Sequence, residues 1–135
     1  MPANELLTYE SSKPRWKKKT DRARASDRAS QTADDEWLHC ARCGAQIAEG
    51  DARCQRAGLH EHSQVNAHGY IWVFGCFTDA PGARTTGDAT TEFTWFAGYL
   101  WRVADCKGCG LHLGWRFEND ENSDVFWALI LERLV

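Results

Sequence analysis

Residues 100–117 read LWRVADCKGCGLHLGWRF, with an apolar segment on each side of a Cys-x-x-Cys-Gly motif. The segments 100–105 and 111–117 are short and rich in apolar and aromatic residues, which is typical of strands. The motif between them is suited to a tight turn, so the two segments are predicted to pair as the arms of a hairpin. Because side chains alternate along a strand, one face of the second arm carries Leu111, Leu113, Trp115 and Phe117.

The same motif occurs twice, as CARCGA at 40–45 and as CKGCGL at 106–111. Two residues between paired thiolates let both sulfurs reach one ion at about 2.3 Å. Gly44 and Gly110 can adopt the positive φ that such a turn tends to require. Four thiolates complete a closed tetrahedral shell, which predicts one structural Zn²⁺ per chain and leaves no open position for a substrate. The predicted ligands are Cys40, Cys43, Cys106 and Cys109.

The cysteines and histidines allow interpretations other than zinc binding. Two such motifs can also hold a single iron, and the sequence leaves zinc and iron open. A redox role for one Cys-x-x-Cys is disfavoured, because no βαβ context is visible. Cys54 and Cys76 have no partner at ligand spacing, and Cys76 is interpreted as a small core residue. The histidines are interpreted as non-ligands, because four cysteines already fill the shell: His39, His60, His62, His68 and His112.

The rest of the chain predicts a mainly β domain tied together by the metal. The segment 69–77, GYIWVFGCF, is apolar on both alternating faces and is predicted to be a strand buried on both sides. Residues 78–92 are rich in Gly, Pro and Thr and are predicted to be a loop, and 117–124 an acidic turn. The final segment, 125–135, is ambiguous between strand and helix.

Composition sets limits on partners and location. The 135 residues allow one domain, predicted to span 37–135 after a polar, disordered tail at 1–36. Eight basic and two acidic residues between Lys13 and Arg28 could touch an acidic surface or act as a nuclear-type signal, but a solvated tail is favoured.

Residues 37–135 carry eight basic and twelve acidic residues, a net charge of −4, so no nucleic-acid partner is expected. No apolar run in the tail is long enough for a signal peptide or a membrane span, and no membrane association is expected. Six cysteines without an export signal indicate a reducing, cytoplasmic location. A monomer is expected.

Residues 92–101, EFTWFAGYLW, concentrate aromatic side chains beside the second motif. Gly98 predicts a tight turn, so Trp95, Trp101 and Trp115 could converge from a turn and two strands. In a small metal-pinned domain such aromatics often make up the core, and composition alone favours that interpretation over a ligand site.

At these residues the sequence resembles the thalidomide-binding domain of the cereblon family, the CULT domain, in a stand-alone form. The matching stretches cover about residues 38–135, and the most specific is the continuous block 92–117. They are CARCGA (40–45), VNAHGYIW (65–72), TTEFTWFAGYLWRVADCKGCGLHLGWRF (90–117) and FWALI (126–130).

The resemblance implies two antiparallel sheets packed across each other in a tent-like fold, with the zinc site near one end. It implies that Trp95, Trp101 and Trp115 form an aromatic cage for a cyclic imide, which reverses the preference for a core. The ligands implied are the glutarimide ring of thalidomide-type drugs, uracil-like rings and protein C-termini that have cyclised to an imide. Other family positions match Phe117 beside the cage and Asn66 and Glu92 at its rim.

The resemblance further implies that the backbone carbonyl of Phe93 accepts the imide N–H and that the backbone N–H of Trp95 donates to an imide carbonyl. Eukaryotic members have histidine where this chain has Phe93, which puts rim polarity and ligand preference in question but not the cage. An imide edge offers acceptor, donor and acceptor groups that backbone can pair with directly.

Two other functions remain as alternatives. An aromatic cage also attracts methylated ammonium groups, with Glu92 and Glu118 as possible counter-charges. The fold also resembles the zinc-containing methionine sulfoxide reductases, but that chemistry needs a reactive cysteine, and none follows Cys109. No catalytic set of residues is visible, so we expect a non-enzymatic binding module.

Overall fold

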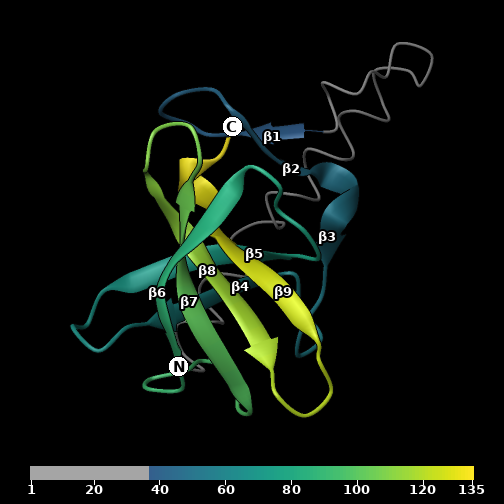
Figure 1. The fold of residues 1–135 in the computed structure, drawn as a ribbon, viewed down its shortest axis with the longest axis vertical. Coiled ribbons are helices and arrows are strands. Elements are labelled where there is room, and N and C mark those ends of the chain that lie inside the picture. The colour runs from purple at the N-terminus through teal and green to yellow at the C-terminus, as the bar shows by residue number, and fades with distance from the viewer. Residues whose placement is uncertain (1–36) are drawn as a thin grey trace.

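A computed structural model describes residues 37–135 of the chain (Figure 1). The predictions made for residues 1–36 fall outside the described residues. The described part is built from strands joined by turns and two short 3-10 helices, and it contains no α-helix.

The strands are β1 (Trp37–His39), β2 (Gln46–Glu49), β3 (Arg53–Cys54), β4 (Glu61–Val65), β5 (Ile71–Phe77), β6 (Ala83–Thr90), β7 (Tyr99–Cys106), β8 (His112–Asn119) and β9 (Val125–Ile130). The 3-10 helices are η2 (Gly50–Ala52) and η3 (Leu131–Arg133).

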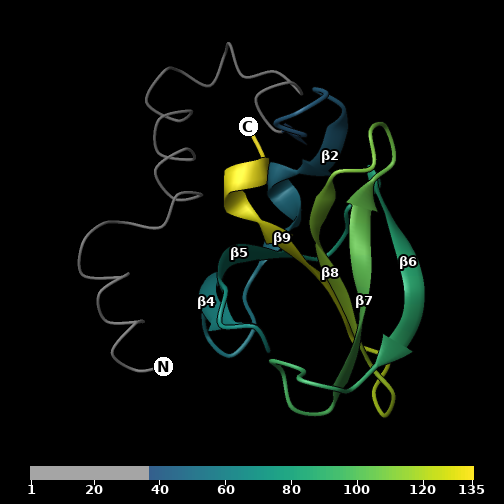
Figure 2. The ribbon, with the colours of Figure 1, turned by 90° about the vertical axis from the view of Figure 1, so that its left-hand side faces the viewer.

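These strands form two antiparallel sheets. β1 and β2 make a two-stranded sheet, and the seven-stranded sheet has the order β3-β5-β9-β8-β7-β6, with β4 also paired to β5. β9 joins the two halves of the larger sheet, because Val125–Leu129 pair with β8 while Trp127–Ile130 pair with β5. In both ribbon views β5 runs across the direction of β7 and β8 (Figures 1 and 2). The predicted mainly β fold with two antiparallel sheets is confirmed.

The predicted hairpin is β7 and β8, paired antiparallel from Tyr99 opposite Asn119 to Asp105 opposite His112. Its inner face is apolar, as the alternation predicts, since Leu113, Trp115 and Phe117 are all buried. Leu113 belongs to a core cluster near the cysteine motifs, whereas Trp115 and Phe117 belong to a second cluster with Phe74 of β5. The hairpin therefore contributes to both cores of the domain.

The prediction of a loop over 78–92 is wrong for most of its length. Residues 83–90 form β6, an edge strand that pairs with β7 from Ala83 opposite Cys106 to Thr90 opposite Trp101. Glycine and polarity suggested a loop, but the β-branched threonines suit a strand whose exposed face needs no apolar residues. A register shift between Thr86 and Thr90 accommodates Gly87, whose φ is +79°.

Other segments follow the sequence-based predictions in part. β5 is buried on both faces only from Phe74 to Phe77, while Ile71 at its start is exposed. The acidic turn is shorter than predicted, because β8 continues to Asn119. The ambiguous C-terminal segment is strand β9 followed by the 3-10 helix η3.

Gly114 lets β8 lie close to β9. Its φ is +151°, and a Cβ placed there would lie 1.9 Å from the carbonyl oxygen of Ala128. No side-chain rotation relieves a contact with backbone, so even a methyl group must separate the strands. The residue after it is Trp115, which means that this close approach also helps to place the Trp115 indole.

We expect Gly114→Ala to lower the free energy of unfolding by about 2–4 kcal/mol, because the strands must separate. Urea titration followed by circular dichroism measures this. Gly87→Ala is the matched control, since Gly87 also has positive φ but nothing lies within 4 Å of an added Cβ. Its cost should be about 1 kcal/mol, from backbone strain alone. Equal losses in the two variants would contradict the proposed clash.

Candidate functional site

The two cysteine motifs meet at one end of the domain. The thiol sulfurs of Cys40, Cys43, Cys106 and Cys109 all lie within 4.8 Å of one another. The Cys40–Cys109 sulfur distance is 3.7 Å and the Cys43–Cys106 distance is 3.6 Å. Sulfurs on a tetrahedral ion with bonds of 2.3 Å lie about 3.8 Å apart, so the four thiols fit a metal ion.

Local backbone geometry shapes this site as the motif predicts. Gly44 and Gly110 have φ of +82° and +83°, the positive values expected after the second cysteine of each motif. The backbone N–H of Gly108 donates to the Cys106 sulfur at 3.2 Å. The backbone N–H of Leu111 lowers the pKa of the Cys109 thiol to about 7, which favours the thiolate that a metal binds.

The remaining cysteines lie elsewhere. Cys54 and Cys76 face each other across β3 and β5, and neither belongs to the four-thiol cluster. Cys76 is fully buried within the second core, as predicted, and burial raises the pKa of its thiol. None of the five histidines belongs to the cluster either.

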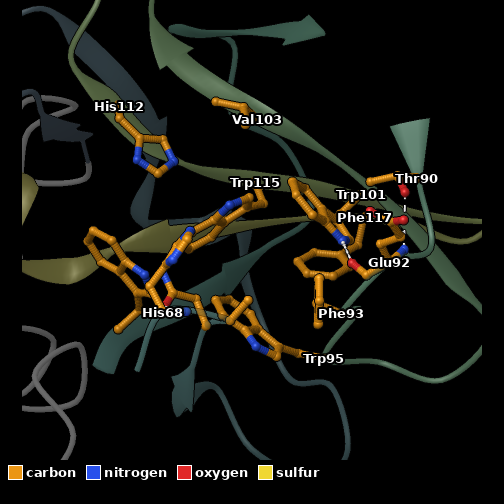
Figure 3. A pocket seen from close by; sticks show the side chains of 13 residues that line it. His68, Thr90, Glu92, Phe93, Trp95, Trp101, Val103, His112, Trp115 and Phe117 are labelled. Atoms are coloured by element: carbon orange, nitrogen blue, oxygen red, sulfur yellow. Dashed lines mark hydrogen bonds between the residues drawn. The ribbon is translucent and has the colours of Figure 1, made fainter. Parts of the chain in front are cut away.

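A pocket of about 350 Å³ lies on the inner face of the β7–β8 hairpin (Figure 3). The three tryptophans of the expected cage all line it, as do the other residues that the resemblance assigns to the ligand: Asn66, Glu92, Phe93, Trp95, Trp101, Trp115 and Phe117. The pocket therefore brings together all seven residues that the resemblance assigns to the ligand, whereas Glu118, the second possible counter-charge for a cation, does not line it.

The hairpin register sets one wall of the pocket. Trp101 lies directly opposite Phe117, and Val103 directly opposite Trp115, so four pocket residues form two adjacent cross-strand pairs. Residues two apart on a strand share a face, which makes this wall continuous. The wall is rigid because both of its strands lie inside the seven-stranded sheet.

Trp95 reaches the pocket from the loop between β6 and β7. Its ring stacks on Phe74 with centroids 5.3 Å apart and meets the Trp115 ring edge-on at 4.8 Å. The Trp95 indole N–H donates to the Val65 carbonyl at 3.1 Å. Trp101 similarly donates to the Glu92 carbonyl at 2.8 Å, as Figure 3 shows. These two bonds attach the loop to the end of β4 through Trp95 and to β7 through Glu92.

Phe93 lies at the turn of this loop in an unusual conformation. Its φ is +56°, in the left-handed region that bulky residues avoid, and its side chain is 72% exposed. Neither its backbone carbonyl nor the Trp95 backbone N–H hydrogen-bonds to another residue within 37–135. Such strain costs of order 1–3 kcal/mol and concentrates at functional sites.

Comparison with known proteins finds that this chain is similar in sequence to cereblon. Cereblon of Gallus gallus is 38% identical over 74 residues, which cover 53% of this chain and 17% of the relative. Cereblon of Drosophila grimshawi is 40% identical over 94 residues, 66% of this chain and 14% of the relative. The described residues form a cereblon-like domain. No protein-family model matches the chain.

The cereblon-like domain corresponds to a small part of its relatives. Cereblon of Drosophila virilis is 48% identical over 71 residues, but these are 11% of its length. The chain thus spans about a sixth or less of the curated relatives that it matches. Among residues 37–135, no helix is long and apolar enough to cross a membrane.

The cereblon-like domain also has pocket residues that sequence reasoning missed. They are Ala67, His68, Trp72, Thr90, Val103 and His112. Trp72 lies in a strand that the sequence predicts to be buried on both sides, and the sequence raises His112 only as a possible metal ligand, so neither was predicted to line a pocket. Val103 could have been found, because it lies two residues after Trp101 on the same strand face.

Asn66 and Glu92 have structural contacts in addition to their places at the rim. The Asn66 side-chain oxygen accepts hydrogen bonds from the backbone N–H groups of His68 and Tyr70, closing the β4–β5 turn. The Glu92 backbone N–H donates to the Thr90 hydroxyl, and its carbonyl accepts from Trp101. Because both backbone groups of Glu92 are hydrogen-bonded, its carboxylate is the part of the residue that is left to contact a ligand.

We expect Cys109→Ser to remove the metal ion and to lower the unfolding free energy by several kcal/mol (about 3 or more), because metal binding is coupled to folding. Elemental analysis and thermal unfolding measure the two effects. Cys54→Ser is the control, since Cys54 lies outside the cluster and its replacement should leave one ion per chain. Retention of one ion per chain by Cys109→Ser would contradict the assignment.

Proposed function

We propose that this domain is a non-enzymatic module that binds cyclic imides between Trp95, Trp101 and Trp115. The observation that carries the proposal is the strained turn at Phe93 beside the pocket. Two backbone groups there, the Phe93 carbonyl and the Trp95 N–H, have no hydrogen-bond partner among residues 37–135. The Phe93 carbonyl accepts the imide N–H, and the Trp95 N–H donates to an imide carbonyl. A mainly apolar pocket with a few polar groups that can fix the orientation of a ligand is typical of a small-molecule site.

The pocket chemistry supports this role. Indole faces pack on the methylene side of the ring and exclude water, which strengthens the hydrogen bonds at its polar edge. Two indole N–H groups are already bonded to the protein, so the cage offers mainly apolar surface. The indole rings then recognise the shape of the ligand, and the backbone groups recognise its polar edge.

The residues favour an imide over a methylated ammonium. Glu92 lines the pocket, but Glu118 does not, and its carboxylate forms an ion pair with Arg116. A cation would therefore have one carboxylate at the rim and none deeper in the pocket. A reductase role is also disfavoured, since no cysteine is among the pocket residues.

We further infer that the four-cysteine ion is zinc and purely structural. Four thiolates leave no open coordination position, and the cluster belongs to the opposite end of the β7–β8 hairpin from Trp101 and Phe117. Iron in the same shell is the alternative, and its visible absorption distinguishes it. Six cysteines without a disulfide among residues 37–135 fit the reducing, cytoplasmic setting that we propose. The natural ligands we propose are small cyclic imides, uracil-like rings and cyclised protein C-termini, bound by a monomer.

Titration with glutarimide should quench tryptophan fluorescence saturably, whereas trimethyl-lysine should not. Trp101→Ala should weaken glutarimide binding at least about 10-fold, because it removes one wall of the cage. The control is Trp37→Ala in β1, outside the pocket, which should bind as the wild type does. Metal content near one ion per chain verifies that each variant is folded. Quenching by the cation alone would contradict the proposal.

Phe93→Asn tests whether the backbone or the side chain recognises the ligand. Asparagine tolerates positive φ better than phenylalanine, so we expect a gain in unfolding free energy of about 0.5–1 kcal/mol. Glutarimide affinity should stay within about 3-fold of the wild type, because the carbonyl is retained. Calorimetric titration and thermal unfolding measure the two quantities. A loss of binding with the fold intact would assign recognition to the phenyl ring.

A further inference from the structure

Two arginines lie side by side on the face of the β7–β8 hairpin opposite the pocket. Trp101 and Val103 of β7 both line the pocket, and side chains alternate along a strand, so Arg102 between them points to the other face. Arg116 of β8 is the direct cross-strand partner of Arg102 and therefore shares that face. We call this side, with Arg102 and Arg116 at its centre, the outer face of the hairpin.

Arg116 is held in place by two neighbours on the outer face. Its Nη1 group donates to the Glu118 carboxylate in an ion pair. Its guanidinium carbon lies 5.9 Å from the ring centroid of Trp127, which is its cross-strand partner in β9. Within residues 37–135 no hydrogen bond uses its Nη2 group. Arg116 is therefore fixed in orientation and still has a donor to offer.

Arg102, in contrast, has neither a hydrogen-bond nor an ion-pair partner in the described part of the chain. Its Nε is buried, but its two Nη groups are not among the buried atoms without a partner and so are open to solvent. The register shift between Thr86 and Thr90 leaves Arg102 without a directly paired residue in β6. The open donors of Arg102 and Arg116 thus concentrate positive charge at one point of the outer face.

This arrangement is unfavourable for the free domain. Like charges directly opposite each other destabilise a strand pair, and Arg102 faces Arg116 in this way. Residues 37–135 carry twelve acidic residues against eight basic ones, yet Glu118 pairs with Arg116 and none of the twelve forms an ion pair with Arg102. An anion bound between the two guanidinium groups would remove the repulsion.

A phosphate monoester fits this pair better than a carboxylate does. The Cβ atoms of directly opposite residues lie roughly 4.5–5.5 Å apart, so one tetrahedral group can accept hydrogen bonds from both guanidinium groups. A carboxylate has two oxygens in one plane, which a single guanidinium fork already satisfies. A phosphate monoester also carries a charge of about −1.5 to −2 at pH 7, close to that of two arginines with the opposite sign.

The surroundings of the two arginines suit a polypeptide that carries the phosphate. Leu100 and Val125 are the cross-strand partners of Glu118 in β7 and β9, and both therefore lie on the outer face. Both are half-buried and leave apolar surface on which a peptide chain can pack. β7, β8 and β9, which carry these residues, are adjacent strands of one sheet (Figure 1).

We propose that the outer face of the hairpin binds a phosphoserine or phosphothreonine of a partner polypeptide. The phosphate oxygens accept hydrogen bonds from the Nη groups of Arg102 and from Nη2 of Arg116. Trp127 and Glu118 hold the Arg116 guanidinium before the ligand arrives, which lowers the entropic cost of binding. The site lies outside the pocket, so it does not depend on the proposed imide function.

NMR titration of the full-length, metal-loaded, ¹⁵N-labelled chain tests the site with four probes. Three are glycine pentapeptides with blocked ends, whose central residue is phosphoserine, glutamate or serine, and the fourth is inorganic phosphate. The phosphoserine peptide should saturably shift the backbone signals of residues 100–102 and 116–118. It should bind at least about 10-fold more tightly than the glutamate peptide, because only the phosphate uses both guanidinium groups. The serine peptide should cause no shift.

Arg102→Gln should weaken binding of the phosphoserine peptide about 10-fold or more, because hydrogen bonds to a charged group are lost. The unfolding free energy should stay the same or rise, since the repulsion from Arg116 is removed. Arg84→Gln is the matched control. It removes the same charge from the same sheet, but Arg84 pairs with Asp105, an odd number of positions from Arg102 and so on the other face. This variant should bind as the wild type does.

Equal losses in the Arg102 and Arg84 variants would show a general charge effect and overturn the site. Equal affinities for the phosphoserine and glutamate peptides, or no shift with the phosphoserine peptide, would overturn it as well. Inorganic phosphate binding as tightly as the phosphoserine peptide would overturn a polypeptide partner. If Arg102→Gln does not fold, the comparison of the four probes on the wild type still decides.

Discussion

The antiparallel register of β7 and β8 is the constraint on which the rest of the structure depends. It places Trp101 opposite Phe117 and Val103 opposite Trp115, so one face of the hairpin becomes a wall of the pocket. A shift of one residue would turn that entire face outward. The absence of a side chain at Gly114 lets β8 lie close to the Ala128 carbonyl of β9, which positions the same strand against the rest of the sheet.

The turn of the same hairpin carries two of the four clustered cysteines. The other two come from the segment between β1 and β2, so a metal ion there would tie the first part of the domain to its central hairpin. Loop closure over such a separation is unfavourable in the unfolded chain, and a metal ion offsets that cost on folding. The cysteine cluster and the pocket thus both depend on one supersecondary unit.

The aromatic residues differ in whether they carry a polar atom and in whether that atom forms a hydrogen bond. This difference distinguishes core residues from pocket residues. Phe74 and Phe126 have no polar atoms, lie outside the pocket lining and pack in the second core cluster. Trp95 and Trp101 have their N–H groups bonded to backbone, which leaves ring surface toward the pocket. The Phe93 turn has backbone groups without a hydrogen-bond partner among residues 37–135, and it lies beside the pocket. An apolar pocket with a few unpaired polar groups is typical of a ligand site.

The sequence by itself determined the cysteine cluster and the β7–β8 hairpin, because ligand spacing and period-two alternation are local properties. The candidate cage came only from the resemblance to a known family, since composition alone favoured a packed core. It did not reveal β6, since an edge strand with an exposed face lacks the apolar pattern of a buried one. Only the tertiary structure decided that Trp72 and His112 belong to the pocket. Whether a residue lines the pocket depends on its burial and on its contacts with residues distant in the chain, and no local sequence pattern encodes either property.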